Sequence, residues 1–174
     1  MSPSKKLMSF LGILTIWIWV SGASAHPHFS KEISFRWDRE DSPQARKMIL
    51  RHITVPYNEI KAGELKAGES WHCGFAKLET SAALKNGSTS IPAGQYEIRV
   101  RKEEGGAWSM HLLHGPKENK KTVELEERLE SDLPVEEHLR FDLHPKGGKD
   151  NPEVRIFLRF GPHLLRTAVV LAED

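Results

Sequence analysis

Apolar and polar residues alternate along most of the chain after residue 30, and this alternation constrains the fold more than any other feature. In the segment 32–37, Ile33, Phe35 and Trp37 are separated by single polar residues. A period of two is typical of a β-strand with one buried face. The same period recurs in the segments 96–101, 108–113, 139–143 and 154–160. The segments 48–55 and 164–171 are more continuously apolar, which favours central strands or strands buried on both faces.

Turn-forming residues separate these segments. Asn86-Gly87 predicts a tight hairpin between 80–85 and 89–91, and Pro92-Ala93-Gly94 predicts a type I turn. Short strands at this spacing are typical of an antiparallel sandwich or barrel, not of a parallel sheet with crossover helices. We therefore predict an all-β fold, an antiparallel β-sandwich of about 8–10 short strands. Its core is expected to contain Trp71, Tyr96, Trp108, Phe141 and Phe160.

Only the segment 122–139 has a pattern compatible with a helix. Leu125 and Leu129 are four residues apart, and Glu124 and Arg128 would form a favourable helical pair. The pattern fits a short helix or a strand, followed by an acidic connection.

The first 25 residues have the three-part pattern of a secretory signal peptide. Lys5 and Lys6 precede an uncharged apolar run from 7 to 20, and Ala23-Ser24-Ala25 is a small-x-small cleavage site. A retained membrane anchor is the alternative, but this run has 14 residues, and crossing a membrane takes roughly 20. We predict cleavage between Ala25 and His26, giving a signal peptide over 1–25 and a single domain over 26–174. That domain is expected to be periplasmic or secreted, without membrane attachment after cleavage.

The charge balance disfavours a nucleic-acid partner. The 25 basic residues include Lys5 and Lys6, so the predicted mature domain keeps 23 of them against 24 acidic residues, a net charge of −1. Nucleic-acid binding usually needs a basic face. On the predicted strands, arginines and acids alternate with core residues. They suit either an anion-binding surface or, as we expect, a solvated sheet with paired charges. These arginines are Arg99, Arg101, Arg140, Arg155 and Arg159.

Cys73 is the only cysteine, so the chain cannot form an intramolecular disulfide. Strict alternation places Trp71, Cys73 and Phe75 on one face of a strand. A thiol that shares a face with two aromatic side chains is expected to be buried and unreactive. A nucleophilic thiol and a metal ligand are the alternatives.

The middle of the chain carries a further pattern, formed by Trp71, Gly74, Ala76, Thr80, Pro92-Ala93-Gly94, Tyr96 and Trp108. With these residues the segment 71–113 resembles the DUF2911 family of exported bacterial domains, and the segment 138–171 looks like that family's last strands. Where the family usually reads WRTGANE, this chain reads WHCGFAK, so His72, Cys73 and Phe75 replace Arg, Thr and Ala. The family has no assigned function, so the resemblance implies export and a β fold but no reaction.

Nine histidines make a metal site worth considering; they stand at 26, 28, 52, 72, 111, 114, 138, 144 and 163. After cleavage, the α-amino group and imidazole of His26 could bind copper together with one more histidine. His28 cannot form the other amino-terminal chelate, because Pro27 lacks the required N–H. His72 and His111 are further candidate ligands, but no pair of histidines has a spacing that predicts a shared ion. We therefore predict no metal site, and copper stays the one alternative cofactor.

The sequence contains no Gly-x-Ser-x-Gly, no His-Glu-x-x-His and no phosphate-binding glycine loop. The leading hypothesis is an exported, non-catalytic β-sandwich that binds a ligand, a glycan or a protein at the cell envelope. The alternative is a periplasmic copper-binding protein that uses His26. A hydrolase with two carboxylates that meet across a sheet is the third hypothesis.

Overall fold

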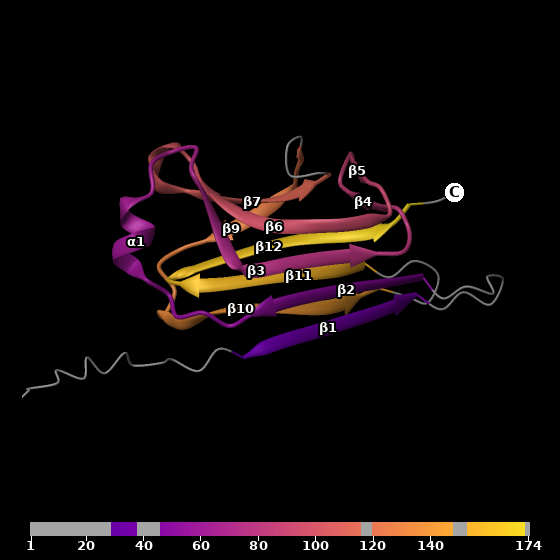
Figure 1. The fold of residues 1–174 in the computed structure, drawn as a ribbon, viewed down its shortest axis with the longest axis horizontal. Helices are drawn as coiled ribbons and strands as arrows, with labels where there is room; N and C mark the ends of the chain where they lie inside the picture. The colour runs from indigo at the N-terminus through magenta and orange to yellow at the C-terminus, as the bar shows by residue number, and fades with distance from the viewer. Residues whose placement is uncertain (1–28, 38–45, 116–119, 148–152, 173–174) are drawn as a thin grey trace, which may run out of the picture.

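The computed structural model describes residues 29–37, 46–115, 120–147 and 153–172. The predicted signal peptide, with its cleavage site between Ala25 and His26, lies outside these residues. Two antiparallel β-sheets form a β-sandwich that is not closed into a barrel, which confirms the predicted fold class. The strands run along the long axis of the molecule (Figure 1).

The first sheet has the strand order β1-β2-β3-β6-β7-β8. Its strands are β1 (Ser30–Trp37), β2 (Arg46–Ile53), β3 (Ser70–Thr80), β6 (Gly94–Lys102), β7 (Trp108–His114) and β8 (Lys121–Glu124). β3 is an interior strand, because it pairs with β2 on one side and with β6 on the other. A short helix, α1 (Glu59–Glu64), follows β2 and lies at one end of the sandwich (Figure 1).

The second sheet has the order β10-β11-β12-β4-β5, and β9 also pairs with β12. Its strands are β10 (Glu136–Lys146), β11 (Glu153–Gly161), β12 (His163–Leu171), β4 (Leu84–Asn86), β5 (Thr89–Ile91) and β9 (Glu127–Glu130). A single 3₁₀ turn, η1 (Glu104–Gly106), connects β6 to β7. The continuously apolar segment 164–171 forms the central strand β12, as predicted.

Alternating residues of both sheets meet in one core. Tyr96, Trp108, Phe141 and Phe160 are buried, as predicted, and Trp71 is half-buried against that core. The Trp108 and Phe160 rings pack edge to face with their centroids 5.5 Å apart. This is a favoured geometry for an aromatic pair, and it adds to the gain from burial.

Two expectations need correction, and one of two alternatives is confirmed. The described part of the chain has twelve strands, more than about eight to ten, because strands of three or four residues are too short to show a period. For the segment 122–139 the strand alternative is confirmed, since the segment contributes β8, β9 and the start of β10. The predicted hairpin is confirmed as β4–β5, but Asn86 pairs with Thr89, so Gly87 and Ser88 form its turn.

Asn86 ties this hairpin to the second sheet. It is buried, and its amide nitrogen donates to the Thr167 hydroxyl and the Ala168 carbonyl, both at 2.8 Å, and to the Glu126 carbonyl at 3.2 Å. Its amide oxygen accepts a hydrogen bond from the Glu126 backbone N–H. A buried amide is tolerated only when its donors and acceptor are satisfied, and here all of them are.

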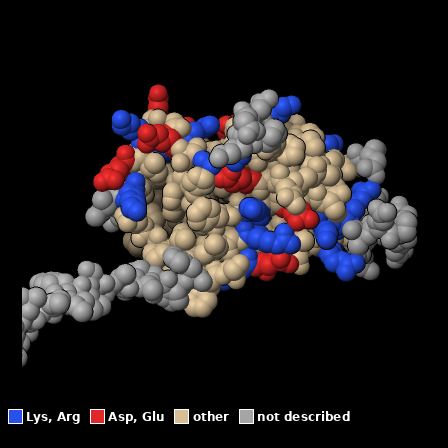
Figure 2. Space-filling view, viewed as in Figure 1, with Lys and Arg blue, Asp and Glu red and all other residues tan. Residues whose placement is uncertain are grey.

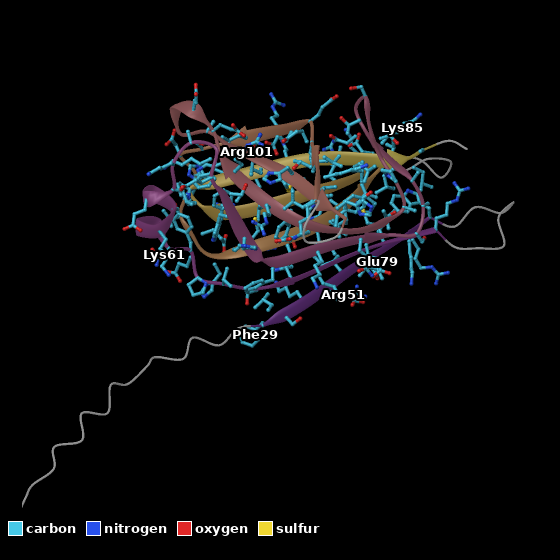
Figure 3. The ribbon with its side chains drawn as sticks, turned by 45° about the horizontal axis from the view of Figure 1, so that its top comes forward. Phe29, Arg51, Lys61, Glu79, Lys85 and Arg101 are labelled. Atoms are coloured by element: carbon cyan, nitrogen blue, oxygen red, sulfur yellow. The ribbon has the colours of Figure 1, made fainter. Side chains whose placement is uncertain are left out.

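The outward faces carry paired charges, as expected. Arg99 contacts Glu97 at 2.7 Å, Arg140 contacts Asp142 at 2.8 Å, and Arg155 contacts Glu153 at 2.7 Å. These pairs join residues two apart on one strand, whereas Arg51 and Glu79 pair across strands at 2.9 Å (Figure 3). Exposed pairs of this kind contribute up to about 1 kcal/mol each. Among the described residues, no helix is both long and apolar enough to cross a membrane.

Candidate functional site

A wide bulge interrupts β3. His72 pairs with Arg99 of β6 and Lys77 pairs with Glu97, so the four residues 73–76 stand opposite Ile98 alone. Gly74 and Phe75 both have left-handed backbone conformations, with φ of 58° and 52°. Glycine adopts this region freely, whereas a residue with a Cβ pays roughly 1–2 kcal/mol there.

The bulge explains why the prediction for Phe75 is wrong. Cys73 is fully buried, as expected, but Phe75 is 65% exposed. Alternation reverses at the bulge because two successive residues turn through left-handed conformations. At Gly74 a Cβ would lie 2.1 Å from the Ile53 carbonyl oxygen, so only glycine fits beside β2. Phe75 is therefore held outward by a tightly packed backbone.

Beside Phe75 lies a cleft of about 670 Å³, bounded by the β2–α1 connection, α1 and the bulge. Val55, Tyr57 and Trp71 line it together with Phe75. The Tyr57 and Trp71 rings both contact Phe160 of the core, at centroid distances of 6.3 and 5.6 Å. The floor of the cleft is thus aromatic and is anchored on the core.

Polar groups are placed around this cleft. Asn58 caps α1, because its side-chain oxygen accepts from the Lys61 backbone N–H at 3.0 Å, and the Lys61 side chain projects from the helix (Figure 3). The His72 ring lies 5.9 Å from that of Phe75, and its Nδ1 is 3.0 Å from a Glu97 carboxylate oxygen. Asn58, Lys61 and His72 all line the cleft.

Glu97 is the centre of a charged network on this face. Besides His72, it contacts Arg99 at 2.7 Å and the Lys120 ammonium group. Partial burial alone would raise the pKa of Glu97, but hydrogen bonds and charge from Lys120 and Arg99 outweigh burial and lower that pKa. Glu97 is therefore a carboxylate at pH 7, and one of its oxygens lies beside the His72 imidazole.

A second, smaller hollow of about 240 Å³ lies on the other side of Phe75. Lys77, Gln95, Glu97, Leu113 and Lys120 line it, and Phe75 borders both hollows. Much of the face shown in Figure 2 carries no Lys, Arg, Asp or Glu side chains. The charged side chains gather near α1 and toward the opposite end of the molecule.

Of the candidate metal ligands, the two that the structure describes, His72 and His111, are not brought together. His26 lies outside the described residues, His72 is exposed beside Glu97, and His111 is buried with its Nε2 3.4 Å from the Ser70 hydroxyl. His72 and His111 stand opposite Arg99 on its two sides, so one strand separates them. Across the described ranges, no group of three or more His, Cys, Asp or Glu side chains could hold a metal ion.

His52 and His111 are buried and uncharged. Within the described part of the chain, neither ring nitrogen of His52 has a hydrogen-bond partner, nor has Nδ1 of His111. Burial lowers the pKa of both imidazoles, so both are neutral at pH 7. His52 packs against Phe141 at a centroid distance of 5.2 Å and belongs to the core.

No pair of carboxylates lines the cleft among the residues that the structure describes. Burial raises the pKa of Glu127 to about 7, but its carboxylate accepts the Met110 backbone N–H at 2.7 Å and so joins β9 to β7. Among the described residues that line the larger cleft there is no Asp, Glu, Ser, Thr or Cys. The cleft can therefore bind by aromatic contact and hydrogen bonding, and it lacks the paired acids of a glycosidase.

No protein-family model, no curated protein and no solved structure matches this chain. The resemblance to the DUF2911 family stays a prediction that rests on the sequence pattern.

The site residue that sequence reasoning missed is Phe75, because the alternation rule assigned it to the core. The available signal was Gly74, since an isolated glycine inside a strand pattern suggests a bulge. α1, which forms one wall of the cleft, has only six residues. That is too short for a helical period to show.

Proposed function

We propose that this chain is an exported, non-catalytic β-sandwich domain that binds a ligand at the cell envelope, with the cleft beside Phe75 as its binding site. One observation carries the proposal. Phe75 is a large apolar side chain that is mostly exposed and is held in a strained backbone conformation. A strained backbone conformation is unfavourable for folding, and such conformations concentrate at functional sites.

The cleft has the properties of a ligand site. Its volume of about 670 Å³ falls within the usual range of small-molecule pockets, roughly 300–1,000 Å³. It is lined by aromatic residues and a few polar groups, as such pockets are. Because Tyr57 and Trp71 rest on Phe160, the floor is organised before a ligand arrives, which reduces the entropy lost on binding.

The absence of Asp, Glu, Ser, Thr and Cys from the described lining favours binding over catalysis. Export is supported by the signal-peptide pattern of residues 1–25 and by the resemblance to an exported family.

This function can be tested by immobilising the mature protein and passing an envelope extract of the native cells over it. We expect retained material on the wild-type protein, its loss on the Phe75→Ala variant, and its retention on a Phe29→Ala variant. Phe29 is the matched control, because it is 63% exposed just before β1 and does not line the cleft (Figure 3). Equal retention by all three proteins would place the binding site elsewhere.

A further inference from the structure

We infer that the ligand is a linear oligosaccharide that lies across Phe75, with sugar units in the hollows on both of its sides. This inference rests on the proposed function and names the chemical class of its ligand. The two hollows form one site. Phe75 borders both of them, and no other residue in the described part of the chain does. The smaller hollow, at about 240 Å³, lies below the roughly 300 Å³ that independent ligand pockets need.

The position of Phe75 between the two hollows determines the shape of a ligand that fits the site. A ring that projects between two hollows contacts the middle of a ligand, and the ligand continues on both sides. Aromatic faces carry partial negative charge, so they attract the slightly positive C–H groups of a flat apolar surface placed against them. Sugar rings present such a C–H surface together with hydroxyl groups around their rim.

The hydrogen-bonding groups of the cleft also suit a sugar. The Asn58 side-chain oxygen is engaged in capping α1, which leaves the amide N–H groups of Asn58 as donors. The ammonium group of Lys61 is a further donor. At His72, Nδ1 lies 3.0 Å from a Glu97 carboxylate oxygen, and a neutral imidazole offers one ring nitrogen as a donor and the other as an acceptor. The cleft therefore offers both donors and an acceptor, which suits hydroxyl groups, since each hydroxyl donates and accepts.

A sugar chain fits this site better than a peptide does. An extended peptide usually binds by adding a strand to a sheet edge. β3, which carries Phe75, is an interior strand between β2 and β6, so it offers no such edge. A helical peptide needs a long apolar groove, but beyond Phe75 the surface carries Lys77, Glu97 and Lys120. Both observations favour the sugar chain.

The test is an array of linear oligosaccharides of two to six units, followed by titration of each hit with the mature protein, read by the fluorescence of Trp71 and its neighbours. We expect affinity to rise from the disaccharide to the tetrasaccharide of one series. Phe75→Ala should weaken binding by about tenfold or more, as deletion of a stacked aromatic does. His72→Phe keeps a ring beside Phe75 but lacks the acceptor, and it should also weaken binding.

A variant of the smaller hollow separates a two-sided site from a single pocket. Gln95→Ala should weaken tetrasaccharide binding several-fold and leave disaccharide binding unchanged, and Phe29→Ala should change neither. All variants are first checked for wild-type unfolding midpoints. A disaccharide that binds as tightly as the tetrasaccharide, or a tetrasaccharide whose binding is unchanged by Gln95→Ala, overturns the inference. If no sugar binds while the extract ligand still requires Phe75, the inference fails and the proposed function stands.

Discussion

The strain at Phe75 can be measured by comparing two substitutions at that one position. Phe75→Ala and Phe75→Gly remove the same aromatic contacts, so the difference between the variants reports on the backbone. Because φ at this residue is 52°, alanine keeps the left-handed penalty and glycine does not. We therefore expect the Phe75→Gly variant to be the more stable of the two, which reverses the usual order of alanine and glycine in a strand.

The size of the difference follows from two opposing effects. The left-handed conformation costs alanine roughly 1–2 kcal/mol. Glycine lowers the free energy of unfolding by about 0.5–1 kcal/mol relative to alanine, because an unfolded chain with glycine loses more conformational freedom on folding. With the midpoints of these ranges, about 1.5 and 0.75 kcal/mol, the net advantage of Phe75→Gly is about 0.75 kcal/mol. For a domain of this size, it corresponds to an increase of about 1–4 °C in the unfolding midpoint.

Urea unfolding followed by tryptophan fluorescence, with thermal unfolding as a second measurement, gives this difference. The control is the same pair of substitutions at Lys77, an exposed residue of β3 without a positive φ, where alanine should be more stable than glycine. If alanine is as stable as glycine at position 75, the left-handed conformation is not a source of strain. The main structural support for a binding site at Phe75 would then be lost.

Three further predictions concern buried groups. Burial raises the pKa of the Cys73 thiol to about 12, so a thiol reagent at pH 7 should label it only after the protein is unfolded; rapid labelling of native protein would contradict this. Trp108→Ala should lower the free energy of unfolding by about 3–5 kcal/mol in urea titration, since it deletes the buried ring against Phe160; an unchanged midpoint would show that this packing contributes nothing. The pKa of Glu127 is raised by burial to about 7, from an ordinary value near 4.5, so between these pH values the native state holds a proton that the unfolded chain has released. Its contribution to stability is therefore lost as pH rises through this window. Glu127→Gln can still accept from Met110 but does not titrate, so its free energy of unfolding should not show this loss as pH rises. The measurement is the free energy of unfolding of both proteins against pH, and parallel curves would refute the assignment.

The sandwich and its core could be predicted because alternation reports directly on which face of a strand is buried. The alternation places Ile98, Val100, Met110 and Phe141 on the buried face, and all four are buried. The prediction fails where a bulge reverses which alternate residues face the core. Residues 73–76 insert extra chain opposite Ile98, and the rule then assigns the wrong face to Phe75.

The candidate site could not be predicted for the same physical reason. Its walls come from the bulge, from a six-residue helix, and from the connection between β2 and that helix, none of which has a period. Trp71 and Tyr57 form its floor because both rest on Phe160, which is about 90–100 residues further along the chain. Such contacts depend on how the two sheets are packed, and a local pattern does not contain that information. The His72–Glu97 pair likewise depends on the register of β3 against β6.

The buried amide of Asn86 has a consequence for producing the protein. Asn86-Gly87-Ser88 is a formal acceptor for N-linked glycosylation, a modification that needs an exposed asparagine. In the fold, the nitrogen that would carry the glycan donates to Thr167, Ala168 and Glu126. A glycan attached during secretion from a eukaryotic cell would therefore prevent the β4–β5 hairpin from joining β12. Expression in such a host calls for Ser88→Ala, which removes the acceptor sequence at an exposed position and leaves the Asn86 hydrogen bonds in place.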